Sequence, residues 1–284
     1  MKKKLKSWAG KLDDAWKRPF RNMRADRLRT QIPLKRETTQ YVAHRGLSGE
    51  APENTVRAFE MAGDLRFQAM ETDIRRTKDN KLVLMHDASL RRMCDQDILV
   101  KDVTYNVLKQ IPIIGGNPSD QYEDDPKAQY VPLLSEYLVI CRDSGMVPMM
   151  ELKDNWNVEE PLDDDYLSDI ICQVKEIMGD APVIFVSFNL NSLIGMQRVA
   201  REEGADNVSL YHLVKKTRDL DLSWYKEHGI NLSIQGKANK LSDIRRIKKA
   251  GISMVVWTVD NPDDARLYIR EGVDWVASNY CLWS

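Results

Sequence analysis

The chain has few cysteines and no long apolar run. Its four cysteines show no CxxC pair and no zinc-ligand spacing, so we expect free thiols: Cys94, Cys141, Cys172 and Cys281. No stretch approaches the roughly 18 apolar residues that a membrane-spanning helix needs. The basic start of the chain is not followed by the apolar segment of a signal peptide. We therefore expect a cytoplasmic protein.

Charge is distributed unevenly along a chain whose formal net charge is only −1. Residues 1–36 contain thirteen Lys and Arg against three Asp, a balance of +10, and the rest of the chain contains 29 basic against 40 acidic residues. We therefore divide the chain into a basic amphipathic N-terminal extension, 1–37, and an acidic body, 38–284.

The N-terminal extension has the periodicity of one helix face. Apolar residues recur at steps of three and four, and basic residues fill most of the other positions: Leu5, Trp8, Leu12, Ala15, Trp16, Phe20 and Met23 form the apolar set. This pattern is typical of a helix that lies on an anionic membrane surface, which would place the protein at the inner face of the membrane. The alternative is a helix that packs on the body or on a second subunit. Nucleic acid is not expected, because the body is acidic.

Short apolar runs alternate with helical segments from residue 41 onward. Eight runs are candidate strands: 41–45, 69–74, 147–152, 183–187, 207–211, 230–234, 253–258 and 274–278. The helical segments between them are 54–65, 133–144, 163–178, 190–203, 217–227, 242–250 and 262–271. Eight strand–helix units predict an α/β protein that forms a single closed (β/α)8 TIM barrel.

One further apolar run, 82–86, follows the second strand too closely for a helix to intervene. We predict that it forms a β-hairpin with that strand over the mouth of the barrel. The segment 88–131 is rich in turn-forming and acidic residues, and we expect an irregular insertion there.

Charged residues gather where the predicted strands end, which is where TIM barrels place their functional groups. The second strand ends in Glu71-Thr72-Asp73, and residues i and i+2 of a strand point to the same side. Two carboxylates inside a barrel need positive charge beside them. A hard cation such as Mg²⁺ or Ca²⁺ would provide it, and salt bridges to Arg75, Arg76 or another cation are the alternative.

Five other predicted strand ends or loops carry candidate site residues. Strand one ends in His44-Arg45, whose guanidinium suits a phosphate oxygen, and the hairpin delivers His86. Strand three ends in Glu151-Leu152-Lys153, a third carboxylate for a metal and a cation for phosphate. Further candidates are Glu53 and Asn54, which either contact ligand or begin a helix, and Trp257, which either forms an apolar wall for substrate or packs in the core.

In combination these residues resemble the glycerophosphodiester phosphodiesterase family, over about residues 41–281. The matching stretches are His44-Arg45-Gly46, Pro52-Glu53-Asn54-Thr55, Glu71-Thr72-Asp73, His86-Asp87, Glu151-Leu152-Lys153, Ser187-Phe188-Asn189, Trp257-Thr258-Val259 and Gly272-Val273-Asp274. The chain departs from the family at its last strand, which ends in Ser278-Asn279 where Thr-Asp is common, and after the His-Asp motif, where Met93-Cys94-Asp95-Gln96 replaces a segment that often contains Thr-Gly.

The resemblance implies a TIM barrel of the phospholipase C-like phosphodiesterase type, with one divalent metal on Glu71, Asp73 and Glu151. It implies that His44 and His86 are the acid–base pair, and that the products are an alcohol and sn-glycerol 3-phosphate. One alternative is a membrane-associated lysophospholipase D-like enzyme that acts on lysophospholipids. A less favoured one is a barrel that binds phospholipid headgroups without turning them over.

Overall fold

The computed structural model describes residues 39–117, 119–153 and 162–282. The basic N-terminal extension, 1–37, lies outside these residues. Within them, no helix is both long enough and apolar enough to cross a membrane.

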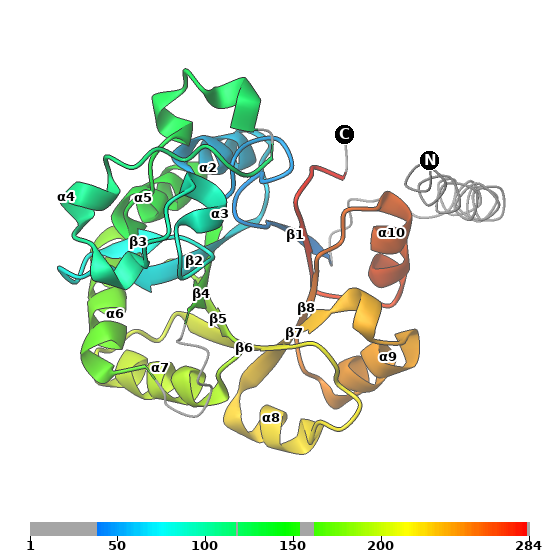
Figure 1. The fold of residues 1–284 in the computed structure, drawn as a ribbon. Coiled ribbons are helices and arrows are strands. Elements are labelled where there is room, and N and C mark those ends of the chain that lie inside the picture. Colours follow the sequence, from blue (N-terminus) through cyan, green and yellow to red (C-terminus); the bar gives the residue numbers. More distant parts are fainter. Residues whose placement is uncertain (1–38, 118, 154–161, 283–284) are drawn as a thin grey trace, which may run out of the picture.

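Eight parallel strands form a closed barrel (Figure 1). The strands pair in the order of the chain, and β1 closes the ring by pairing with both β2 and β9. The staves are β1 (Gln40–Ala43), β2 (Ala69–Arg76), β4 (Val147–Leu152), β5 (Val183–Ser187), β6 (Val208–Val214), β7 (Ile230–Gln235), β8 (Met254–Trp257) and β9 (Trp275–Ser278). The predicted TIM barrel is confirmed.

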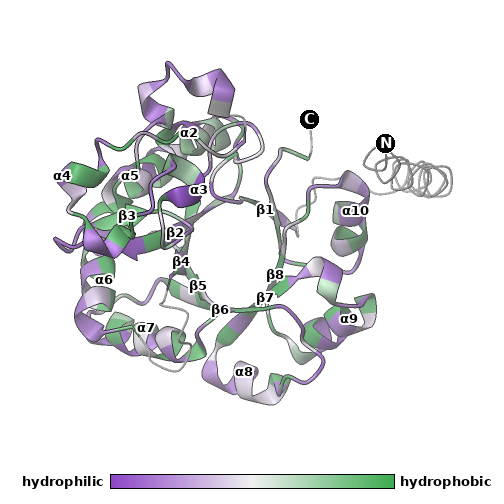
Figure 2. Ribbon diagram, in the orientation of Figure 1, coloured by the Kyte–Doolittle hydropathy of each residue, from purple (hydrophilic) through white to green (hydrophobic). Residues whose placement is uncertain are grey.

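Helices pack around the outside of the barrel, between successive strands (Figure 1). The longer ones are α2 (Val56–Asp64), α5 (Leu134–Ser144), α6 (Asp164–Met178), α7 (Leu190–Glu202), α8 (Leu222–His228), α9 (Leu241–Ala250) and α10 (Pro262–Arg270). The buried residues of these helices are almost all apolar, and Figure 2 shows apolar and polar residues interspersed along each helix.

Alternate residues of each strand belong to two different apolar clusters. One cluster fills the barrel interior and includes Val42, Ala69, Met149 and Val255. The other lies between strands and helices, and includes Met70. Because strand side chains alternate, the residues two and four positions beyond the interior cluster also face the barrel axis. Those positions, at the C-terminal ends of the strands, carry the charged residues described below.

The segment after β2 folds over one side of the barrel mouth. β3 (Leu82–Leu84) pairs antiparallel with β2, which confirms the predicted hairpin. The insertion then forms short helical turns: α3 (Arg91–Cys94), η1 (Val100–Asp102), α4 (Tyr105–Leu108), η2 (Ser119–Tyr122) and η3 (Pro126–Ala128). A separate apolar cluster that includes Val83, Leu90 and Leu108 holds these turns together.

The start of α8 differs from the prediction, and the state of the cysteines agrees with it. β6 extends to Val214, and α8 begins at Leu222, so the prediction of a helix from residue 217 was wrong. The physical reason is the cap: the Asp221 carboxylate accepts hydrogen bonds from the backbone N–H groups of Ser223 and Trp224, which sets the first turn there. The four cysteines are free thiols, as predicted.

Candidate active site

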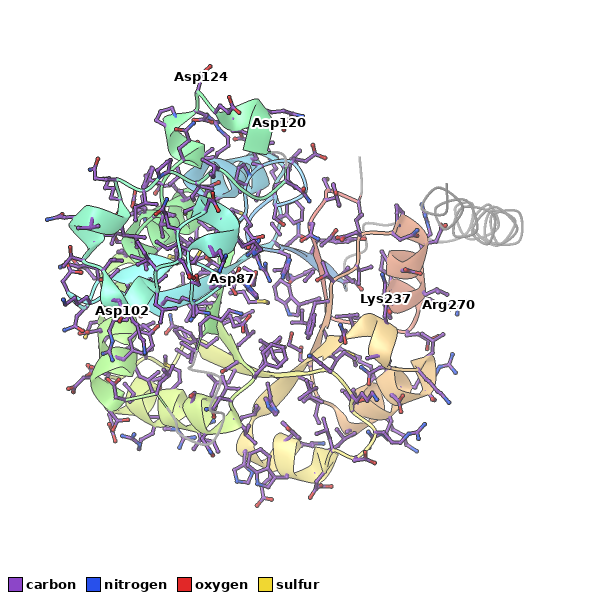
Figure 3. All side chains as sticks on the ribbon, in the orientation of Figure 1. Asp87, Asp102, Asp120, Asp124, Lys237 and Arg270 are labelled. Carbon is purple, nitrogen blue, oxygen red and sulfur yellow. The ribbon has the colours of Figure 1, made fainter. Side chains whose placement is uncertain are left out.

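Three carboxylates converge inside the mouth of the barrel. Glu71 and Asp73 lie within β2, and Glu151 lies near the end of the neighbouring β4, directly beside Asp73. One oxygen from each lies within 4.8 Å of the others, and the three residues are only 6 %, 0 % and 8 % exposed. Alternation along the two strands therefore brings the three predicted metal ligands together in a buried group. The acidic stretch around Asp120 and Asp124, by contrast, lies at the outer edge of the molecule (Figure 3).

Two cations compensate part of this negative charge. The Lys153 ammonium lies 2.7 Å from Glu151 Oε1 and 3.1 Å from Asp73 Oδ1. Arg45 Nε lies 3.3 Å from Asp73 Oδ2, and the Arg45 backbone N–H donates to Glu71 Oε2 at 2.9 Å. Both residues were predicted to contact phosphate, and both also neutralise the carboxylates.

Arg75 and Arg76, the alternative neutralising cations suggested by the sequence, point elsewhere. Arg75 donates to the backbone carbonyls of Met85 and His86, and Arg76 pairs with Asp163 outside the barrel. Arg75 thus fixes the backbone of the hairpin that carries His86. The salt-bridge alternative is therefore wrong for these two arginines.

Burial sets the charge states of the three carboxylates. It raises the pKa of Glu71 well above its usual value, and the adjacent Asp73 raises it further. Burial likewise raises the pKa of Glu151 to about 7, although Lys153 opposes that shift. For Asp73, the effect of burial is outweighed by Lys153 and Arg45, which hold its pKa well below its usual range. Two of the three carboxyl groups therefore resist ionisation in this environment.

Asn54 supports Asp73 from the turn before α2. Its Nδ2 donates to Asp73 Oδ2 at 2.7 Å, and its Oδ1 accepts from the Thr72 hydroxyl at 2.8 Å. Thr55, not Asn54, caps α2 by accepting from the Ala58 backbone N–H. Asn54 thus positions a candidate metal ligand and does not begin the helix.

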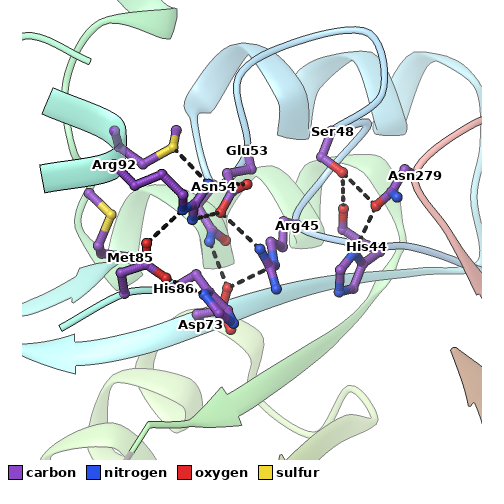
Figure 4. Close-up of polar contacts among 12 residues, drawn as sticks. His44, Arg45, Ser48, Glu53, Asn54, Asp73, Met85, His86, Arg92 and Asn279 are labelled. Atoms are coloured by element: carbon purple, nitrogen blue, oxygen red, sulfur yellow. Dashed lines mark hydrogen bonds and ion pairs between the residues drawn. The ribbon is translucent and has the colours of Figure 1, made fainter. Parts of the chain in front are cut away.

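His44 follows β1 and lies on one side of the carboxylates (Figure 4). Its Nδ1 lies 2.8 Å from Asn279 Oδ1, and its Nε2 lies 4.0 Å from Glu71 Oε2. Burial and the adjacent Arg45 guanidinium lower the pKa of His44 to about 4. His44 is therefore neutral near pH 7, with Nε2 on the side of the carboxylates.

His86 lies on the other side, at the start of a chain of alternating charges (Figure 4). Its Nδ1 is 2.6 Å from Asp87 Oδ1, and Arg92 Nε is 2.6 Å from Asp87 Oδ2. Arg92 also donates twice to Glu53, at 2.7 and 3.0 Å, and Glu53 accepts from Arg45 at 2.9 Å. Glu53 thus connects the two arginines. In this structure it does not belong to the carboxylate group.

A cavity of about 230 Å³ extends from the carboxylates into the barrel mouth, and both histidines line it. Trp257 forms one wall, where its ring meets Phe188 edge to face at 5.9 Å. Trp257 therefore lies where an apolar wall was predicted. The remaining lining is mainly apolar: Met149, Val186, Leu213, Val255 and Ala277.

Four residues of this region were not singled out as site residues from the sequence. Phe188 and Lys215 line the cavity because each lies two residues beyond an interior-facing position of its strand, a signal that alternation could have supplied. Asn279 contacts His44 from the loop after β9, and Asp260 in the loop after β8 bonds to Asn279. No local sequence pattern indicates these contacts.

Known proteins resemble this chain in sequence and in fold. The model of the glycerophosphoryl diester phosphodiesterase family matches residues 44–282. A glycerophosphodiester phosphodiesterase of Caldanaerobacter subterraneus is 27% identical over 246 residues, 85% of this chain and 94% of that protein. The Bacillus subtilis protein YhdW is 40% identical over 248 residues, 84% of this chain and 93% of that protein.

Among solved structures, an Oleispira antarctica phosphodiesterase in complex with the product sn-glycerol-3-phosphate is similar, with a TM-score of 0.74 and 25% identity. The alignment covers 89% of this chain and 95% of that one. A Parabacteroides distasonis glycerophosphodiester phosphodiesterase shares the fold, with a TM-score of 0.67, 24% identity, and coverage of 86% and 94% of the two chains.

Proposed function

Because the chain belongs to the glycerophosphoryl diester phosphodiesterase family, we propose that His44 and His86 hydrolyse glycerophosphodiesters to an alcohol and sn-glycerol 3-phosphate. One observation carries the proposal. Two histidines with different hydrogen-bond partners flank a buried group of three carboxylates and two cations, and both histidines line one cavity together with Arg45, Glu71 and Glu151. The chain is an enzyme, a phosphoric diester hydrolase.

The carboxylate group fits a divalent cation. Its three oxygens converge from two strands, and the buried Asp73 Oδ1 has no hydrogen-bond partner among the described residues, only the Lys153 ammonium at 3.1 Å. Glu71, Asp73 and Glu151 would hold Mg²⁺ or Ca²⁺, both of which prefer oxygen ligands. Such a cation polarises phosphoryl oxygens and offsets their developing charge.

The two histidines divide the proton transfers. His44 is neutral and accepts a proton at Nε2 from the attacking hydroxyl group, which we take to be the neighbouring hydroxyl of the substrate's own glycerol. Burial lowers the pKa of His86, and the Asp87 carboxylate opposes that shift. Asp87 thus favours the protonated form of His86, which donates its proton to the leaving alkoxide. Water then opens the cyclic phosphate, with the two histidines in reversed roles. Arg45 and Lys153 stabilise the charge on the phosphoryl oxygens.

Substitution of each histidine tests this proposal. We expect His44→Ala and His86→Ala each to lower kcat by about 10²-fold or more, because each removes one proton transfer. His228→Ala is the matched control, since His228 is exposed on α8 and does not line the cavity, and it should retain wild-type turnover. Near-wild-type hydrolysis by either active-site variant would contradict the assignment of His44 and His86 as the acid–base pair. A wild type that binds glycerophosphodiesters without any turnover would instead support the alternative of a barrel that only binds headgroups.

A lysophospholipid is the second candidate substrate. The supporting observation is the apolar lining of the cavity together with Phe188, a large apolar side chain that is 43 % exposed at its rim. Hydrolysis of glycerophosphocholine and of lysophosphatidylcholine should be compared at equal concentration. A higher kcat/KM for the lysophospholipid would identify a lysophospholipase D-like enzyme.

We also propose that residues 1–36 bind an anionic membrane surface, which would place the enzyme in the cytoplasm, on the inner face of the membrane. The basis is the +10 balance and the apolar stripe of that segment. Flotation with phosphatidylglycerol vesicles should recover the full chain but not a version that starts at Glu37. Equal recovery of both would reject the segment as the anchor.

A further inference from the structure

Asn279 stands between His44 and a carboxylate that does not reach the cavity. Its Oδ1 lies 2.8 Å from His44 Nδ1, and its Nδ2 donates to Asp260 Oδ2 at 2.9 Å. The Asn279 backbone N–H donates to the other oxygen, Asp260 Oδ1, also at 2.9 Å. Asp260 therefore holds both the backbone and the side chain of Asn279 from the loop after β8.

The bond between the two side chains decides which way the amide of Asn279 points. A carboxylate only accepts hydrogen bonds, so the amide must turn its NH₂ group to Asp260. Its oxygen is then the atom that faces His44. The Ser48 hydroxyl, 2.9 Å from the same oxygen and 2.7 Å from the His44 carbonyl oxygen, is compatible with this orientation because it can donate its proton to either.

An amide oxygen can only accept, so the nitrogen that faces it must carry the proton. In the neutral imidazole of His44 that nitrogen is Nδ1, and Nε2 then has a free lone pair. Nε2 is the nitrogen on the side of the carboxylate group, 4.0 Å from Glu71. A flipped amide would present an N–H to Nδ1 instead, and the proton would have to move to Nε2.

We propose that Asn279 and Asp260 are positioning residues that hold His44 in the tautomer with a free Nε2. The inference rests on the proposed function in so far as that free nitrogen is the proton acceptor. The tautomer itself is a property of the resting protein. Neither Asn279 nor Asp260 needs to contact the phosphodiester.

Asp260→Asn is the first test, because it replaces a pure acceptor with a group that can also donate. The new side-chain NH₂ group at position 260 can then bond to Asn279 Oδ1 and let the Asn279 amide turn over. We expect the ¹⁵N shifts of the His44 ring, assigned with a His44→Gln variant, to change from the tautomer protonated at Nδ1 toward a mixture. We also expect kcat to fall about tenfold with a smaller change in KM, because a positioning loss acts on the proton transfer.

The exchanged pair, Asn279→Asp with Asp260→Asn, is the second test. The new carboxylate at position 279 would still accept from His44. The new amide at position 260 would donate to that carboxylate with its NH₂ group and accept from the backbone N–H of residue 279 with its oxygen. Every hydrogen bond between these three side chains is thereby restored, with the negative charge moved from one loop to the other. We expect the tautomer protonated at Nδ1 and most of kcat to return.

Asp264→Asn, in the first turn of α10, is the matched control because it makes the same chemical change without contacting Asn279. It should retain the native ring shifts and kcat. The proposal is overturned if Asp260→Asn keeps the native tautomer, or if the folded exchanged pair shows the same ring shifts as the single variant. If the wild type showed no phosphodiesterase activity, the proposed function would fail, while the ring shifts would still decide the tautomer.

Discussion

At the scale of single residues, opposite charges alternate through the site in one connected series. It runs from His86 through Asp87 and Arg92 to Glu53, and from there through Arg45 to Asp73. Glu53 lies between the two arginines, and Asp87 and Asp73 each pair with one of them. This pairing lowers the cost of burying the carboxylates. The series links the histidine of the hairpin to Asp73, the candidate metal ligand in β2.

The electrostatic role of Asp87 in this series can be tested separately from its role in packing. Asp87→Asn retains the size of the side chain but removes the charge that supports protonated His86. We expect kcat to fall by about 10- to 100-fold, with a smaller change in KM, because the loss affects proton donation more than binding. Steady-state kinetics on glycerophosphocholine would measure it. A change confined to KM would mean that Asp87 contributes to binding and not to proton transfer.

His212 gives a prediction for the pH dependence of stability. Its ring bonds to the Tyr225 hydroxyl and the Phe188 carbonyl, and burial lowers its pKa below the usual value. The unfolded chain therefore binds more protons than the folded chain below about pH 6.5. The stability that His212 contributes is complete above that pH and is lost as pH falls toward and through the folded pKa.

We expect His212→Gln to show a smaller loss of stability on acidification than the wild type. Urea unfolding midpoints, measured from about pH 8 down to about pH 5, would report the difference. Parallel curves for the two proteins over this range would show that His212 does not contribute to the pH dependence.

At the scale of elements, the turn from β1 into α2 places His44 and Arg45. Arg45 and Gly46 both have left-handed backbone conformations, with φ of 56° and 73°. A Cβ atom on Gly46 would lie 2.7 Å from the backbone carbon of Ala58 in α2. Close packing of this turn against α2 thus sets the direction of the two site residues.

Gly46→Ala should therefore destabilise the fold more than the strain of a positive φ alone would. We expect a loss of stability of about 3 kcal/mol or more, from overpacking added to backbone strain, together with reduced turnover. Gly145→Ala is the control, because Gly145 has φ of 67° but no atom within 4 Å of the added Cβ. It should lose only about 1 kcal/mol. Equal losses in urea unfolding would show that contact with α2 is not limiting.

At the scale of the whole molecule, apolar side chains fill the barrel interior below its mouth, and charged side chains lie at the mouth. Three carboxylates in this position oppose folding unless positive charge accompanies them. Lys153 and Arg45 supply part of it. Burial raises the pKa values of Glu71 and Glu151, and Asp73 adds to both shifts.

Divalent cations should therefore stabilise the entire fold. We expect Mg²⁺ or Ca²⁺ to raise Tm and EDTA to lower it and to abolish activity, because a ligand that binds only the native state adds RT ln(1 + [L]/Kd) to its stability. Glu71→Gln should be as stable as the wild type in EDTA, or more stable, since it removes a carboxyl group whose ionised form is costly to bury. It should gain little from the cation and lose turnover.

Thermal unfolding of both proteins, with each cation and with EDTA, would test this linkage. Full activity of the wild type after exhaustive chelation would remove the metal from the mechanism. A cation-induced rise in Tm that is the same in Glu71→Gln would place the cation elsewhere.

The sequence predicted the barrel well because its signals are local. Strand and helix periodicity identified all eight staves and the hairpin of β3, and the i, i+2 spacing of Glu71 and Asp73 put both on the inner face. The start of α8 was missed because the Asp221 cap competes with a helical pattern that continues upstream. The hydrogen-bond and ion-pair partners of Arg75 and Arg76 were not predicted, because a long side chain can reach several partners.

The sequence by itself determined which residues face the barrel axis, because alternation along a strand is a property of the backbone and needs no partner. Only the tertiary structure decided which of them meet. The contact of His44 with Asn279, 235 positions apart, exists because β1 closes the barrel against β9. The direction of the Asn279 amide depends in turn on Asp260 from a third loop. Such hydrogen bonds depend on the relative placement of separate elements, which no local pattern encodes.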